Sequence, residues 1–277
     1  MIIWLASYPK SGNTFMRALL SSYFFSKDGI CNFETLKNIK QFPYGPLFKK
    51  IGIDISDDKK VVKNYIKAQE VFNKNNSVQF IKTHSALFDG FTNYQNTLGV
   101  IYIIRDPRNV AISAANHFNY SLEESVNRLL NPCVLGGFNN KINRYSVVHH
   151  ITSWSVNYLS WKLLEKQNRY LLIKYEDLTQ NTEFVLNKIL EFIYKLMKQD
   201  FSIDKNKFIN VIQSTKFEKL QKLEKETKFD ESVKHDGEKK TFFKYGPKSN
   251  SQKILDKSLK EKIETSLKNE MRELGYL

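Results

Sequence analysis

The sequence predicts an α/β fold, in which a mostly parallel sheet is covered by helices on both faces. The chain opens with an apolar run of strand length, Ile2 to Ala6, which passes through a short loop into an apolar-periodic helix. Further along, Gly99 to Ile104 is almost entirely apolar, as expected for a strand buried on both faces of a parallel sheet. Because open α/β sheets bind ligands at the carboxyl ends of their strands, we expect the chemistry to lie in the loops that follow them.

Composition limits the classes of protein to which this chain can belong. Its 277 residues can bury the core of one large domain, and no linker or repeat divides them, so we expect a single domain over residues 1–277. The 43 Lys and Arg against 29 Asp and Glu give a net charge of +14. This charge favours anionic partners such as nucleotides, nucleic acid, membrane surfaces or sulfated and phosphorylated substrates. A general bias toward lysine explains it equally well.

The two cysteines point to a reducing compartment. Cys31 and Cys133 are too few for a disulfide scaffold, and neither has metal-ligand spacing to a histidine. The N-terminal apolar stretch is too short to span a membrane, and no basic region precedes it. We therefore expect a cytoplasmic protein with no transmembrane segment.

The loop after the first apolar run has the character of an anion site. A strand-to-helix loop presents backbone N–H groups and a helix N-terminus to a ligand. Lys10 adds a positive charge, and Ser11, Asn13 and Thr14 add hydrogen-bond donors. The loop is not a nucleotide P-loop of the G-x-x-x-x-G-K-[ST] type, because Lys10 precedes its only glycine, Gly12. An ordinary strand-to-helix turn remains an alternative.

Chemistry-bearing residues also follow the second and third strands. Lys82, Thr83 and His84 end the second strand, and a histidine has the pKa range needed to take a proton from an alcohol. Arg105 follows the third strand, and its planar fork can hold a phosphate bidentately. Ser113 lies about two turns along the helix that begins there. An ion pair at the start of the helix is the alternative role for this arginine.

The remaining elements are predicted from apolar periodicity and turn residues. The highly charged segment 224–240 is expected to be solvated and mobile, or to form a lid over a ligand. The paired His149 and His150 have no neighbouring carboxylate or cysteine at ligand spacing, so no metal site is expected. The expected order is an irregular stretch 25–52, a helix 57–73, a strand 78–82, a helix from Pro107 with Asp106 as its N-cap, a helix 121–130, a loop 131–144, a long helix beginning at His149, a strand 170–174, helices 183–197 and 205–213, the charged segment 224–240 and a terminal helix 256–277.

Three of these segments together resemble a known family. The run Tyr8-Pro9-Lys10-Ser11-Gly12-Asn13-Thr14 resembles the phosphosulfate-binding loop of the sulfotransferases that use 3′-phosphoadenosine 5′-phosphosulfate (PAPS). Lys82-Thr83-His84 is similar to the triplet that carries the catalytic base in cytosolic-type members. Arg105 and Ser113, eight residues apart, match the pair that grips the 3′-phosphate of PAPS.

The resemblance continues to about residue 246, with one departure. Tyr175-Glu176-Asp177 resembles the segment whose tyrosine lies near the adenine, and Ser214-Thr215-Lys216-Phe217 resembles the second adenine contact. The family usually has Arg-Lys-Gly as a third phosphate contact, followed by Gly-Asp-Trp. Here the triplet is Lys244-Tyr245-Gly246 and the Gly-Asp-Trp is absent. Lysine lacks the arginine fork, and Lys248 is the candidate that compensates.

The resemblance implies transfer of a sulfonate from PAPS to a hydroxyl group of a small molecule or glycan by in-line displacement. His84 would deprotonate the acceptor, Lys10 and Lys82 would stabilise charge on the phosphate oxygens, and Ser113 would hold Lys10 aside until acceptor binds. No metal is required, and no nucleic acid is expected as a partner. The implied PAPS-binding residues are Lys10, Ser11, Gly12, Asn13, Thr14, Phe15, Arg105, Ser113, Tyr175, Thr215, Phe217, Lys244, Tyr245 and Gly246.

Two other classes stay open from the residues alone. A P-loop kinase would share the strand–loop–helix, but it should show G-K-[ST] and an aspartate for Mg²⁺. A nucleic-acid-binding protein would explain the charge, yet the lysines are spread along the chain instead of forming one stripe. The acceptor pocket is expected from the loops 29–50, 85–97 and 131–146, which do not identify the acceptor. The family's short dimer motif is not found, so the sequence leaves the oligomeric state open.

Overall fold

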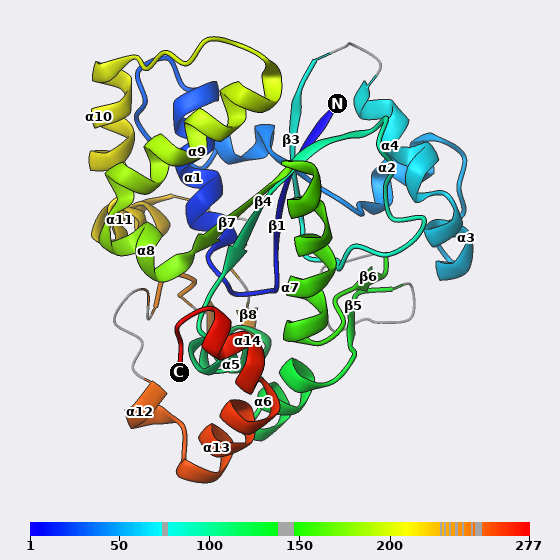
Figure 1. The fold of residues 1–277 in the computed structure, drawn as a ribbon, viewed down its shortest axis with the longest axis vertical. Coiled ribbons are helices and arrows are strands. Elements are labelled where there is room, and N and C mark those ends of the chain that lie inside the picture. Colours follow the sequence, from blue (N-terminus) through cyan, green and yellow to red (C-terminus); the bar gives the residue numbers. More distant parts are fainter. Residues whose placement is uncertain are drawn as a thin grey trace.

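The centre of the protein is a five-stranded sheet in which all neighbouring strands are parallel, in the order β2-β3-β1-β4-β7 (Figure 1). The computed structural model describes residues 1–73, 77–137, 147–227, 229, 231–232, 234–235, 238–239, 241–244, 246 and 251–277. The predicted α/β fold with a parallel sheet is confirmed. The strands are β1 (Ile2–Ser7), β2 (Lys40–Gln41), β3 (Gln79–Thr83), β4 (Thr97–Ile104) and β7 (Tyr170–Lys174).

The sheet is covered on both faces because its central strand is apolar on both. Ile3 and Leu5 of β1 pack into one cluster with helices α1 and α9, while Trp4 packs into the other with α4 and α7. In Figure 1 α1, α9 and α10 lie to one side of the strands and α7 and α4 to the other. The bounds of these helices are α1 (Asn13–Phe25), α4 (Tyr65–Asn73), α7 (Trp154–Lys162), α9 (Thr182–Met197) and α10 (Lys205–Ser214).

Strand β1 lies between β3 and β4, and the chain leaves β1 toward β2 on one side of the sheet but leaves β4 toward β7 on the other, so the connections diverge between β1 and β4. Ligands of open α/β sheets bind at such a switch point, beyond the carboxyl ends of the strands. The remaining elements are η1 (Thr35–Asn38), α2 (Gly45–Lys50), α3 (Asp58–Lys63), α5 (Pro107–Phe118), α6 (Leu122–Leu130), β5 (Val134–Leu135), β6 (His149–His150), η2 (Leu163–Gln167), α8 (Tyr175–Gln180), α11 (Phe217–Glu226), β8 (Lys234–His235), β9 (Glu238–Lys239), α12 (Ser251–Ile254), α13 (Lys257–Ser266) and α14 (Lys268–Glu273).

Several predicted boundaries hold because local capping fixes them. Asp106 caps α5 by accepting a hydrogen bond from Arg108 N, and Pro107 is the first helical residue. Ser121 caps α6 in the same way through Glu124 N. Strand β7 begins and ends where the sequence predicts, at residues 170–174.

Other predicted elements are wrong. The stretch 25–52 is not irregular: it contains η1, α2 and the edge strand β2, which is two residues long and too short to give a period. The predicted helix 57–73 is two helices, α3 and α4, separated at Asn64. The predicted terminal helix 256–277 is likewise broken at Leu267 into α13 and α14.

The predicted helix start at His149 is also wrong. His149 and His150 form β6, which pairs antiparallel with β5. Thr152 then has a positive φ of 64°, and Ser153 caps α7 through Val156 N, so the helix cannot begin before Trp154. Among the described residues, no helix is both long enough and apolar enough to cross a membrane.

Candidate active site

A cavity that is open to solvent lies at the carboxyl ends of β1, β3 and β4, with about 930 Å³ of space when its open mouth is included. Most of the residues predicted to carry chemistry line it. They are Lys10, Gly12, Asn13, Thr14, Phe15, Lys82, His84, Arg105, Ser113, Tyr175, Phe217, Lys244 and Gly246. The structure therefore brings together the loops that follow four different strands. Tyr245 and Lys248 lie outside the described residues.

The β1–α1 loop is shaped by close packing against Tyr175. Gly12 has a φ of 103°, and a Cβ placed there would lie 2.3 Å from the Tyr175 ring, so only glycine fits. Helix α1 begins at Asn13 without a side-chain cap. Ser11 is fully buried, and its Oγ has no hydrogen-bond partner among the described residues. An uncapped helix start beside an unsatisfied buried hydroxyl suits an anionic ligand.

Asn13 shapes the end of β1. Its Nδ2 donates to Leu5 O at 2.9 Å and to Ser7 Oγ at 3.2 Å, so the amide nitrogen is turned toward the strand.

Lys10 has a positive φ of 67°, and its Nζ lies 3.8 Å from the centre of the Phe242 ring. The lysine head therefore sits beside the cavity over an aromatic face.

His84 is held in one tautomer. Its Nδ1 lies 2.9 Å from the carbonyl oxygen of Ser7. The Ser7 hydroxyl also lies 3.2 Å from Nδ1, but the carbonyl is closer and can only accept, so this geometry favours the proton on Nδ1 and the lone pair on Nε2. Burial, and secondarily the positive charge of Lys82, lower the pKa of His84 well below its usual value. The ring is therefore neutral at neutral pH and able to accept a proton at Nε2.

The Arg105 guanidinium joins three predicted parts of the site. Nη1 donates to Lys10 O and Nη2 to Gly246 O, both at 3.2 Å. The guanidinium also lies 4.5 Å from the centre of the Tyr175 ring. The fork is thus pre-oriented between the first loop and the third motif, and Arg105 as a whole residue is only 5% exposed.

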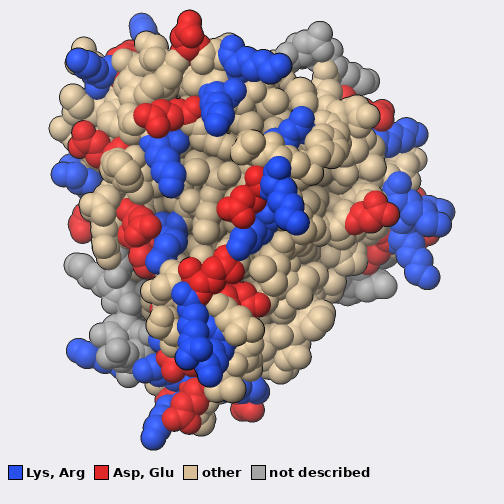
Figure 2. All heavy atoms as spheres, in the orientation of Figure 1, with Lys and Arg blue, Asp and Glu red and all other residues tan. Residues whose placement is uncertain are grey.

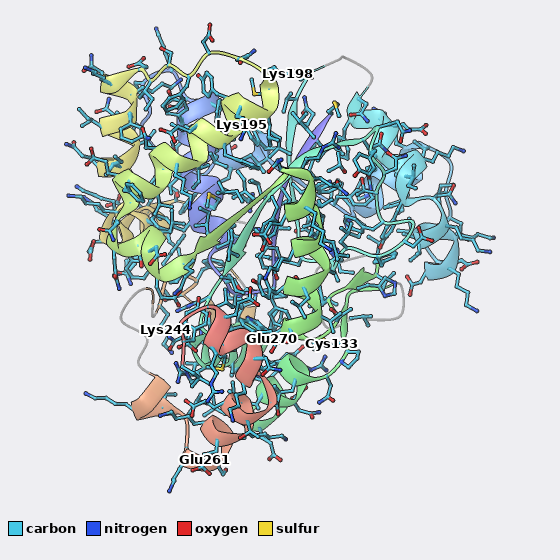
Figure 3. All side chains as sticks on the ribbon, in the orientation of Figure 1. Cys133, Lys195, Lys198, Lys244, Glu261 and Glu270 are labelled. Atoms are coloured by element: carbon cyan, nitrogen blue, oxygen red, sulfur yellow. The ribbon has the colours of Figure 1, made fainter. Side chains whose placement is uncertain are left out.

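Lys244, which is labelled in Figure 3, lines the same cavity from the C-terminal part of the chain. Its Nζ donates to Asn116 Oδ1 at 3.1 Å. Asn116 lies on α5 about one turn beyond Ser113, which is half-buried and faces the cavity. Lys10, Lys244, Arg105 and Ser113 therefore line one cavity and supply it with positive charge and a hydroxyl group, which suits a phosphate.

A second cavity, with about 780 Å³ of space when its open mouth is included, adjoins the first and shares Phe15, Tyr175, Phe217 and Phe243 with it. Thr215 also lines it, although this residue does not line the first cavity. The hydroxyl of Thr215 donates to Val211 O at 2.7 Å, so its oxygen can still accept a hydrogen bond from an amino group. Aromatic walls with one such acceptor suit a flat purine base.

Hydrogen bonds that involve Glu176 and the C-terminal Tyr276 hold the loop that carries Arg105. Asp106 N donates to Glu176 Oε1 at 3.0 Å, and Tyr276 OH donates to Glu176 Oε2 at 2.9 Å. Arg108 pairs with Asp106 and also donates to Tyr276 O at 2.9 Å. The terminal segment thus fixes the start of α5, from which Arg105 projects.

Sequence reasoning missed two charged residues at the site. Arg17 pairs with Glu231, and the carboxylate of Glu231 also contacts Thr14 and lies 3.3 Å from Lys82 Nζ. Arg17 lies one turn beyond Asn13, so its helical spacing could have indicated a position facing the loop. Nothing in the sequence indicates that Glu231 faces the site, because it belongs to the charged segment 224–240 that is predicted to be solvated. In the structure its side chain is only 13% exposed.

The residues around the two cavities suit an adenosine phosphate ligand. No group of three or more His, Cys, Asp or Glu residues in the described part of the chain could hold a metal ion. The buried Ser11 hydroxyl, the Gly12 turn and the Arg105 fork instead form a cradle for anionic groups. The aromatic second cavity lies beside this cradle.

Comparisons with known proteins agree with this geometry. The chain is 24% identical to mouse Sulfotransferase 1B1 over 221 residues, which are 79% of the chain and 64% of that relative. The solved structure of mouse sulfotransferase SULT7A1 complexed with PAP (3′-phosphoadenosine 5′-phosphate) superposes with a TM-score of 0.63 at 17% identity. The superposition covers 98% of this chain and 84% of that one.

A structure of retinol dehydratase in complex with androsterone and inactive cofactor PAP gives a TM-score of 0.63 at 15% identity, covering 98% of this chain and 80% of that one. At these identities the superpositions establish the shared fold. Residues 2–275 match the family described as the sulfotransferase domain, and the chain therefore belongs to this family.

Proposed function

We propose that the protein transfers a sulfonate group from PAPS to a hydroxyl acceptor. The observation that carries this proposal is the meeting of three groups in one cavity: the Lys10–Gly12 loop, the Lys82/His84 pair and the Arg105 fork. Membership of the sulfotransferase domain family supports it, and so do the structural neighbours described as complexed with PAP, the product nucleotide. Residues 1–277 are proposed to act as one domain.

The donor site follows from charge and shape. The 3′-phosphate would be held by Arg105, Ser113 and Lys244, and the 5′-phosphosulfate by the uncapped start of α1 with Ser11 and Thr14. The adenine would lie between the aromatic walls of the second cavity, with its amino group toward Thr215. No metal takes part in this proposal.

The reaction is proposed to be an in-line displacement, for which PAPS supplies an activated sulfonate and a phosphate leaving group. His84 Nε2 removes the proton from the acceptor hydroxyl, while Ser7 O keeps the proton on Nδ1. Lys10 and Lys82 neutralise the negative charge that grows on the departing phosphate and on the sulfonate oxygens. Ser113 lines the cavity with Lys10 and is proposed to hold it aside until acceptor binds.

The acceptor is proposed to be an alcohol on a small molecule or a glycan. A further, narrow recess shares Pro9 and Phe118 with the donor cavity. Its wall is mostly apolar, including Leu129, Leu135 and Ile151, and this favours a small apolar acceptor over a glycan. The free thiols of Cys31 and Cys133 fit a cytoplasmic location.

The alternatives receive less support. A P-loop kinase should have a lysine after the second glycine of its loop, and this chain has none there. In addition, ATP has no 3′-phosphate for Arg105 and Lys244 to bind. A nucleic-acid-binding protein should present a basic stripe. Figure 2 shows a face on which Lys and Arg alternate with Asp and Glu.

Transfer of radiolabelled sulfate from PAPS to a library of alcohols tests the proposal. We expect at least one alcohol to be labelled by the wild type and not by His84→Asn. Labelling from ATP in a kinase assay, with none from PAPS, would contradict it.

A further inference from the structure

The donor cavity already contains an anion that belongs to the chain itself. Glu231 Oε2 accepts a hydrogen bond from Thr14 Oγ1 at 2.6 Å. Glu231 Oε1 lies 3.3 Å from Lys82 Nζ and forms an ion pair with Arg17. The side chains of Arg17 and Lys82 are only 8% and 3% exposed, so this carboxylate is shielded from solvent among three donors. Thr14 and Lys82 are the same groups to which the proposed function assigns the phosphosulfate.

We propose that Arg17, Thr14 and Lys82 form the site for the sulfonate of the donor, and that the Glu231 carboxylate fills this site until the donor displaces it. The inference rests on the proposed function and deepens it. It assigns Arg17 as a further sulfonate-binding residue. It also makes Glu231 an internal competitor of the donor.

Carboxylate and sulfonate exclude each other at this position. The Thr14 hydroxyl has one proton, and Glu231 now accepts it. Two negative groups within about 4 Å repel strongly where water is excluded. Arg17 can serve either anion without moving far, because its Nη2 is anchored to Leu36 O at 3.2 Å while Nη1 faces the carboxylate.

The chain on both sides of Glu231 is anchored, so the exchange is assigned to its side chain. Phe229 packs on Phe33 with ring centres 4.3 Å apart. Ser232 Oγ donates at 2.9 Å to Glu224, a buried carboxylate on α11 that also accepts from Phe242 N at 2.7 Å. A rotation of the Glu231 side chain is then sufficient to clear the site, because a glutamate has three rotatable torsions.

A permanent tether is the competing explanation. In that case the Arg17–Glu231 ion pair would hold the segment over the cavity whatever is bound, and PAPS would bind beside it. The two explanations predict opposite effects of Glu231→Gln. Removing a competitor strengthens donor binding, whereas removing a tether weakens it.

The test is calorimetric titration of PAPS and of PAP into the wild type, Glu231→Gln and Glu226→Gln. Glu226 is the matched control: it is an exposed carboxylate on α11, paired with Lys222 at 3.6 Å, and its replacement changes the net charge equally. We expect Glu231→Gln to bind PAPS at least tenfold more tightly than the wild type. PAP affinity should rise less, because PAP lacks the sulfonate, and Glu226→Gln should bind both as the wild type does.

Thermal unfolding provides a second measurement on the same proteins. Without ligand, Glu231→Gln should unfold at a lower temperature than the wild type, because Arg17 and Lys82 lose a buried partner. Saturating PAPS should recover this loss. Arg17→Lys keeps the charge without the fork and should weaken PAPS binding more than PAP binding.

Unchanged or weaker PAPS binding by Glu231→Gln, with normal binding by the wild type, would overturn this inference and leave the proposed function intact. Failure of the wild type to bind either nucleotide would instead overturn the proposed function, and the inference with it. If Glu231→Gln does not fold, Glu231→Asp provides the decision. Its shorter side chain should still release the site and strengthen PAPS binding, and unchanged binding by this variant counts against the exchange.

Discussion

Replacement of His84 by asparagine should remove most of the turnover while keeping the shape of the site. His84 Nδ1 contacts Ser7 O at 2.9 Å, and an asparagine amide can still donate to this carbonyl. The variant has no nitrogen lone pair to take the acceptor proton. Loss of a general base typically costs about 10²–10⁴ in rate, which corresponds to roughly 2.7–5.4 kcal/mol of activation free energy. The donor contacts are untouched, so PAP affinity should stay within a few-fold of the wild type.

The assay is the rate of sulfate transfer from PAPS with saturating acceptor, followed from pH 5 to 8. Burial and Lys82 lower the pKa of His84, so the ring should already be neutral at pH 6.5. The wild-type rate should therefore stay flat down to that pH and fall only below it. Full activity of the purified His84→Asn variant, or an acid limb centred above pH 6.5, would refute the assignment of His84 as the base.

Three further predictions concern the loop and the histidine. Lys10→Ala should lower kcat strongly and donor affinity less, because its proposed role is on transition-state charge; a rise in KM for the donor with kcat unchanged would make Lys10 only an anchor. Gly12→Ala should destabilise the protein by about 1–3 kcal/mol in urea unfolding, because its Cβ would meet Tyr175 at 2.3 Å. Gly90→Ala is the control that isolates this clash: Gly90 also has a positive φ, 83°, but a Cβ added there would meet no atom within 4 Å. Because the pKa of His84 is lower in the folded protein than its usual 6.5, unfolding takes up protons, so stability should be full above pH 6.5 and fall as pH drops toward the folded pKa. His84→Asn should reduce this loss, and an unaltered pH dependence would count against it.

The sequence predicts the sheet well where strands are long and fully buried. Ile2 to Ala6 and Gly99 to Ile104 are apolar on both faces, and a parallel sheet is the common solution for such strands. Strand β2 has two residues and carries no period, so only its pairing with β3 reveals it. The helix predicted from His149 extended the apolar stripe of α7 too far, because the cap at Ser153 and the turn at Thr152 are not visible in periodicity.

The candidate site is predictable to the extent that it follows the strands. Lys10, His84 and Arg105 lie within three residues of strand ends, and parallel strands bring their carboxyl ends together, so the cavity follows from the order of the sheet. Glu231 lies 149 residues from Lys82 and reaches it only through tertiary packing. A charged segment with no period cannot reveal which of its carboxylates turns inward.

Thermal protection by nucleotides tests the proposed donor site, because a PAPS site must recognise the 3′-phosphate. PAP should raise the unfolding temperature of the wild type far more than ADP does, since only PAP carries the 3′-phosphate that Arg105, Ser113 and Lys244 are proposed to bind. A hundredfold difference in affinity corresponds to about 2.7 kcal/mol of additional stabilisation at saturating concentrations. Arg105→Ala should shrink the difference between the two nucleotides more than Lys244→Ala does, because only arginine offers a bidentate fork. Equal protection by PAP and ADP would contradict the account and favour a kinase.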